Sequence, residues 1–141
     1  MAVDLTTGQV WQEIDKQLFA VLGFVTPKQE ARTVGIVYVT SDRKLYIGSE
    51  REAWKVKHIA QNPHVSLTVT IPKSVPFMPF IKIPAATITF AGTAQILGVD
   101  AVSAAVIEKL YRGMKIDEAF KEQSAVIEVT PVREFMTYGV G

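Results

Sequence analysis

The sequence predicts a mainly β fold, a six-stranded antiparallel β-barrel with flanking α-helices. Two observations carry this prediction: short runs rich in Val, Ile, Tyr and Thr recur along the whole chain, and turn-forming residues separate them. Segments with the 3.6-residue period of a helix lie between these runs. At 141 residues the chain suits one domain, residues 1–141, with a sizeable core.

The first half of the chain begins with a predicted amphipathic helix at residues 7–19, for which Thr6 and Gln9 offer a starting cap. Strands are predicted next at residues 20–26, 33–40 and 44–48, with polar connections at 27–30 and 41–43. A short helix at 51–61 and an alternating, half-buried strand at 64–71 follow. The apolar face of the first helix consists of Val10, Trp11, Ile14, Leu18 and Leu22.

Residues 72–84 interrupt this pattern, because their four prolines argue against a helix or a central strand. The segment is nevertheless apolar, so we expect a long loop that packs on its own core or a subunit partner, or that forms a lid over a ligand. A strand at 86–97 comes next, and Asp100 is the expected cap of a helix that runs to about Arg112. A short turn of helix at 117–122 and a strand at 125–129, leading on to residues 133–138, complete the chain.

The segment from Leu45 to Val65 carries the main functional signal. Ser49 and Glu52 have the spacing of a capping box, which predicts a helix start at Ser49. A helix start gathers unpaired N–H groups and the positive end of the helix dipole. With Lys55 about one turn into the helix, this place is a plausible seat for a phosphate.

Composition excludes several other kinds of function. The formal charge of +1 gives no overall field for attracting nucleic acid or an anionic membrane, so neither is an expected partner. The chain has no cysteine, and its two histidines, His58 and His64, lack ligand-like spacing, so we expect no metal site. We also expect both histidines at the surface or at a strand edge. No signal peptide or long apolar run is visible, which favours a cytoplasmic protein.

The ordered local motifs resemble the FMN-binding split-barrel family related to pyridoxamine 5′-phosphate oxidase. Members typically show a strand that begins with Arg, a hairpin, a strand that ends in small or hydroxyl residues, a helix carrying Lys, and Asn-Pro. The matching residues here are Arg32, Gly48, Ser49, Lys55, Asn62 and Pro63. The resemblance extends over nearly the whole chain and implies a homodimer with FMN at the subunit interface.

By that resemblance, Lys55 would bind the FMN phosphate and Ser49 would add a hydroxyl or backbone contact. The second strand would line the ribityl chain and the ring edge, and Thr87 would contact the ring. The residues expected at the cofactor are Arg32, Thr33, Val34, Gly35, Gly48, Ser49, Arg51, Trp54, Lys55 and Thr87. No acid–base pair stands out, so the catalytic residues stay unknown.

Departures from the oxidase argue against pyridoxamine phosphate oxidation itself. Trp54 stands where a second cation commonly precedes the lysine, and Arg51 is the residue that could replace that cation. The ending Tyr138 to Gly141 lacks the arginine-containing tail that holds the substrate of that enzyme. We therefore expect a flavin-dependent oxidoreductase for another small molecule, with residues 72–84 favouring a hydrophobic or aromatic one. The alternatives are a deazaflavin (F420)-dependent reductase and a non-catalytic protein that binds flavin or haem.

Overall fold

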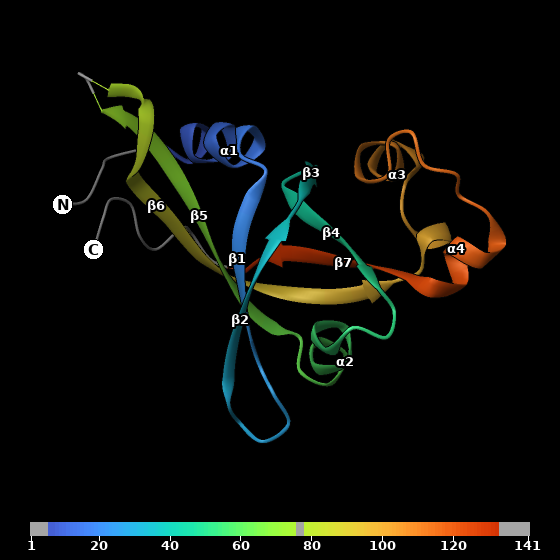
Figure 1. Ribbon diagram of the computed structural model, residues 1–141. Helices are drawn as coiled ribbons and strands as arrows, with labels where there is room; N and C mark the ends of the chain where they lie inside the picture. The colour runs from blue at the N-terminus through green and yellow to red at the C-terminus, as the bar shows by residue number, and fades with distance from the viewer. Residues whose placement is uncertain (1–5, 76–77, 133–141) are drawn as a thin grey trace.

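The computed structural model describes residues 6–75 and 78–132, with only the backbone for 72–75 and 78–86 (Figure 1). The described residues form seven strands, four α-helices and one short 3-10 helix. In chain order the elements are α1 (Thr7–Lys16), β1 (Phe19–Val25), β2 (Ala31–Val37), β3 (Val39–Ser41), β4 (Lys44–Glu50), α2 (Trp54–Gln61), β5 (His64–Val75), β6 (Met78–Leu97), η1 (Val99–Ala101), α3 (Ala104–Leu110), α4 (Glu118–Gln123) and β7 (Ser124–Pro131).

One antiparallel sheet with the strand order β2-β1-β5-β6-β7-β4-β3 contains all seven strands. The sheet curls until β2 lies close to β4, although these two strands do not pair by hydrogen bonds. A curled sheet that closes without that last ladder is a split barrel, so the predicted fold class is confirmed. The seventh strand arises because the predicted strand at 33–40 is divided at Tyr38: β2 pairs with β1, whereas β3 pairs with β4.

Helix α1 starts where the sequence predicts and ends earlier. Thr6 Oγ1 accepts from the Gln9 N–H, and the Gln9 side chain accepts from the Thr6 N–H, which makes a complete capping box. The helix stops at Lys16, because residues from Phe19 onward pair with β2 instead. The predicted apolar face is therefore wrong at Leu18, whose side chain is 70% exposed, while Leu22 is buried from β1.

The predicted hairpin connection at 41–43 is confirmed as a tight turn between β3 and β4. Ser41 pairs with Lys44, and the two residues between them, Asp42 and Arg43, have φ values of 50° and 57°. Positive φ at both central positions is typical of a type I′ turn, whose twist matches that of the flanking strands. The polar connection at 27–30 is also a turn, which Thr26 closes through backbone bonds to Gln29 and Glu30.

The predicted loop at 72–84 is wrong, because β5 and β6 continue through most of it as a long hairpin (Figure 1). The backbone pairs Pro72 with Pro84, and the register shifts between Ile71 and Pro72 and again near Val75. Such irregularities let a ladder accept residues that lack an N–H donor. Residues 76–77 lie outside the described residues, as do residues 133–138.

The helical segments after β6 also differ from the sequence prediction. Asp100 lies within the 3-10 helix η1, and α3 starts later, with Ser103 as its cap. The predicted short helix at 117–122 is confirmed as α4, capped by Asp117. Helix α3 packs on β3 and β4, and its Val106 forms a second buried cluster with Tyr46 and Val126. None of the helices among the described residues is long and apolar enough to cross a membrane.

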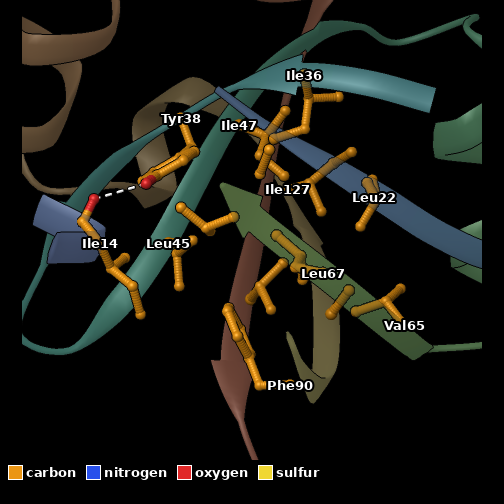
Figure 2. Packing of buried hydrophobic residues seen from close by; sticks show 14 of the residues in the cluster. Ile14, Leu22, Ile36, Tyr38, Leu45, Ile47, Val65, Leu67, Phe90 and Ile127 are labelled. Carbon is orange, nitrogen blue, oxygen red and sulfur yellow. Dashed lines mark hydrogen bonds between the residues drawn. The ribbon is translucent and has the colours of Figure 1, made fainter. Parts of the chain in front are cut away.

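The main core fills the inside of the barrel and reaches α1 and α2 (Figure 2). Its largest fully buried side chains include Ile14, Leu22, Leu45, Ile47, Leu67, Phe90 and Ile127. Tyr38 is buried with them at the point where the chain passes from β2 to β3. Its hydroxyl donates to the Ile14 carbonyl at 2.6 Å, so this bond ties the sheet to the last turn of α1.

We predict that Tyr38→Phe lowers the free energy of unfolding by about 1–3 kcal/mol, because the buried Ile14 carbonyl loses its donor. Tyr111→Phe is the matched control: the Tyr111 hydroxyl is buried and has no partner among the described residues, so its removal should be neutral or stabilising. Urea unfolding of both variants measures the difference. Equal losses in the two variants would contradict the prediction.

The same tyrosine predicts a pH dependence. Burial, and then the nearby Asp15 carboxylate, raises the pKa of Tyr38 above the ordinary value of 10. Because the pKa is raised in the folded state, Tyr38 contributes its full stabilisation of the fold below pH 10. This stabilisation is lost above pH 10, where the tyrosine of the unfolded chain ionises. Between about pH 10 and 11.5, the unfolding free energy should therefore fall more steeply for the unsubstituted protein than for Tyr38→Phe.

Candidate functional site

The predicted cap of α2 at Ser49 is wrong. Ser49 lies in β4, where it pairs with Ala125, and its hydroxyl donates to the Glu50 carbonyl at 3.2 Å. The helix begins at Trp54, because the β4–β7 ladder keeps the chain extended as far as Glu50 and a turn follows. The Glu52 carboxylate, which was expected to complete the box, forms an exposed ion pair with Lys57 at 3.0 Å.

The N-terminus of α2 consequently has no side-chain cap. Its capping residue is Ala53, which offers no side-chain acceptor. The N–H groups in the first turn of a helix have no acceptor within the helix, so those of Trp54, Lys55 and Val56 are available to an anion. Lys55, the second residue of the helix, is partly buried, and no ion pair occupies its ammonium group among the residues that the structure describes. The start of α2 therefore combines the Lys55 ammonium group with N–H donors that have no acceptor within the helix.

Arg51 is engaged in holding the structure. Its Nη2 donates to the carbonyls of Lys121 and Ser124 at 3.3 and 3.4 Å, and its backbone N–H donates to Gln123 at 2.8 Å. These bonds fasten the turn before α2 to the junction between α4 and β7. The guanidinium therefore already has acceptors, which argues against its substituting for the second phosphate cation.

An aromatic stack fixes the side of α2 that faces β1. The His58 ring stacks on Trp54 at a centroid distance of 5.5 Å and on Phe24 at 5.9 Å, with interplanar angles of 22° and 21°. His58 is partly buried, rather than fully exposed as a surface residue would be, and its Nδ1 has no partner among the described residues. Trp54 lies at the outside of the stack and is 75% exposed, so it is not a core residue. The spacing of residues 54 and 58 on a helix was the sequence signal for this contact.

The predicted β2 residues point to two different sides of the sheet. Val34 packs against the core, and on the same side Arg32 and His58 line one hollow of about 340 Å³ between α2 and the β1–β2 turn. Thr33 and Gly35 lie on the outer side, where the Phe19 ring occupies the space that a side chain at Gly35 would need. The Arg32 guanidinium is exposed and lies 3.5 Å from Glu30.

Two further predicted residues lie away from α2. Thr87 is inside β6 rather than at the start of a strand, and it pairs with Thr70. It alternates with the buried Ile88, so it belongs to the outer side of the sheet with Thr33 and Gly35. Gly48 faces α3: a Cβ there would lie 2.8 Å from the Tyr111 hydroxyl, which explains the glycine by packing.

Of the predicted residues, Trp54 and Lys55 lie at the start of α2, and Arg32 shares a hollow with His58 of the same helix. Ser49 lies in β4, before the turn that leads into α2. Thr33, Gly35 and Thr87 belong to the other side of the sheet. No three side chains of metal-ligand type come together among the described residues. The pKa values of Tyr46 and the partly buried Tyr111 are raised chiefly by desolvation, so neither is poised as a base near neutral pH.

Comparison with known proteins gives one family match, to the pyridoxamine 5′-phosphate oxidase model over residues 6–138. No curated protein matches the sequence. Solved structures with the same fold include an FAD-binding protein from Mesorhizobium loti, with 14% identity, TM-score 0.65, and coverage of 94% of this chain and 93% of that one.

Two other solved structures are of proteins described with different ligands. HutZ, a haem storage protein from Vibrio cholerae, is 15% identical with TM-score 0.69, and the match covers 96% of each chain. A protein described as an F420 reductase is 16% identical with TM-score 0.59, and the match covers 86% of this chain and 92% of that one. At these identities the likeness shows the fold alone.

We predict that Gly48→Ala destabilises the protein by about 1–3 kcal/mol, because the new methyl group collides with the Tyr111 side chain. Gly98→Ala is the control, since nothing lies within 4 Å of a Cβ there and its φ of −74° suits any residue. Thermal unfolding compares the two. If packing is the reason for the glycine, Tyr111→Ala in the Gly48→Ala background should recover part of the loss.

Proposed function

Because this chain belongs to the pyridoxamine 5′-phosphate oxidase family of split barrels, we propose that it binds a flavin nucleotide through an FMN moiety and is a flavin-dependent oxidoreductase for a small molecule. The observation that carries the proposal is the uncapped start of α2 beside Lys55. Free N–H donors and an ammonium group without an ion pair among the described residues are the partners that a phosphate needs. A cytoplasmic location stays a prediction.

The residues around α2 fit this role. Lys55 and the N–H groups at the start of α2 would hold the phosphate, and the Ser49 hydroxyl, whose present acceptor is only its neighbour's carbonyl, could turn toward it. Arg32, on the far side of the hollow that it shares with His58, would meet the ribityl chain or ring edge. When bound, the flavin would supply the redox chemistry, and the chain would supply position, charge and exclusion of water.

The match to the family does not by itself select a reaction, since its fold also occurs in proteins described as an F420 reductase and a haem storage protein. These remain the alternatives. The part that the segment 72–84 plays toward the substrate also stays a prediction, because the structure gives only its backbone and leaves Phe77 outside the described residues.

Purified protein should show the absorption spectrum of an oxidised flavin, and Lys55→Ala should lower flavin affinity by about 10- to 100-fold because it removes a charge-assisted phosphate contact. Lys57→Ala is the matched control: that lysine is two residues away and already pairs with Glu52. Fluorescence titration of the cofactor-free protein gives both affinities, and bleaching by a nicotinamide donor tests for reduction. A deazaflavin or haem spectrum, or unchanged flavin affinity in Lys55→Ala, would contradict the assignment.

We further propose that the protein is a homodimer with the cofactor at the subunit interface. The outer side of β1 and β2 carries exposed Phe19 and Val37, which pair across the two strands, and β2 has a free edge in the sheet that the described residues form. Threonines and small residues continue this surface onto β5 and β6. A second copy packed here would cover Thr33, Gly35 and Thr87, the predicted cofactor residues that lie on this side of the sheet.

Val37→Asp should shift the protein from dimer to monomer and lower flavin retention at least about tenfold, because a carboxylate would be buried in the contact. Met114→Asp changes a comparably exposed apolar residue that lies outside this surface and should leave both properties unchanged. Light scattering after size exclusion reports the mass. A monomeric unsubstituted protein, or a dimeric Val37→Asp variant, would refute the proposed contact.

A further inference from the structure

We propose that the hollow between α1, β3 and α3 is a second binding site, and that it takes a small carboxylate with an apolar body. The hollow has a volume of about 420 Å³, and its lining includes Asp15, Leu18, Val39, Thr40, Lys109 and Arg112. This volume is in the range of small-molecule sites. No residue of α2 lines it, and Figure 1 shows α1, β3 and α3 at the upper end of the molecule, with α2 at the lower end.

Two cations form the part of the hollow that would hold the carboxylate. Lys109 Nζ donates to the Thr40 carbonyl at 3.0 Å, which leaves two of the three ammonium hydrogens for a ligand. The same bond holds the ammonium group over β3 before any ligand arrives. Arg112 has neither an ion pair nor a side-chain hydrogen bond among the described residues, so its planar fork is available to a carboxylate.

The remaining charges at the hollow limit the ligand to one negative charge. Asp15 also lines it, and its Oδ1 accepts from the Thr40 hydroxyl at 2.7 Å. Two cations against this one carboxylate leave a single positive charge, and a second anionic group on the ligand would face Asp15. The adjoining hollow of about 570 Å³ adds Asp42 and Arg43, whose charges cancel. A monocarboxylate therefore matches the site.

The apolar part of the site is Leu18, with Val39 beside it. The Leu18 side chain is 70% exposed, and it lines the same hollow as the two cations. Apolar area exposed to water is unfavourable, and a ligand that covers it gains affinity in proportion to the area removed from water. An apolar body on Leu18 would therefore add to the charge contact. This pairing distinguishes the expected ligand from a simple inorganic anion.

The test is an NMR titration of isotope-labelled protein with three probes. Phenylpropionate has both features of the proposed ligand, phenylpropylammonium reverses the charge of the head group, and acetate lacks the apolar body. We expect phenylpropionate to bind with a Kd below about 1 mM and to shift the backbone N–H signals of Leu18, Val39 and Thr40. The other two probes should bind at least about tenfold more weakly.

Substitutions assign the two parts of the site. Lys109→Gln, Arg112→Gln and Leu18→Ser should each weaken phenylpropionate binding by about three- to tenfold. Lys115→Gln and Met114→Ser are the matched controls, because these residues do not line the hollow, and they should stay within about twofold of the unsubstituted protein. All five positions are exposed, so the variants should keep the fold, and their NMR spectra check this.

Several outcomes would overturn the proposal. These are the absence of saturable shifts at the hollow, shifts confined to α2, acetate binding as tightly as phenylpropionate, and unchanged affinity in Lys109→Gln and Arg112→Gln. A changed oligomeric mass in Leu18→Ser would also overturn it, because Leu18 precedes Phe19 of the proposed dimer contact and would then serve that contact. The flavin proposal is tested separately by Lys55→Ala, so either proposal can fail alone.

Discussion

The passage of the chain from one side of the barrel to the other depends on Tyr38 and its bond to Ile14. At this residue the chain leaves its pairing with β1 and begins its pairing with β4, and neither ladder holds the crossing itself. The carbonyl of Ile14 lies in the last turn of α1, where helix carbonyls lack N–H partners. The tyrosine hydroxyl therefore satisfies a buried acceptor and fixes the helix and the crossing together.

Closure of the barrel then determines what surrounds α2. The curl brings β2 toward β4. Helix α2 covers β1 and β6, and its own residues Val56 and Ile59 are buried. This arrangement leaves the side of α2 that carries His58 next to the hollow that Arg32 also lines. The same closure puts Thr33, Gly35 and Thr87 on the opposite face, so the residues expected at the cofactor are divided between two sides of one chain.

Several features could be predicted from short stretches of sequence because their causes are local. The Thr6 and Gln9 cap, the turn at Asp42 and Arg43 and the short helix predicted at 117–122 each involve residues close together in the chain. The capping box at Ser49 was equally plausible by spacing and was wrong, since pairing of Ser49 with Ala125 keeps that residue in a strand. The prolines at 72 and 84 also led to a wrong prediction, that of a loop, because a register shift accommodates them within a hairpin.

The sequence by itself determined the mainly β class, the split-barrel family and the cation at residue 55, because alternation, turn chemistry and an ordered motif are properties of neighbouring residues. Only the tertiary structure decided which donors and cations are available. Arg51 is satisfied by the distant carbonyls of Lys121 and Ser124, Gly48 is required by Tyr111, and Trp54 is held by a stack that ends on β1. Such contacts join residues far apart in the chain, and they exist only after the sheet has closed.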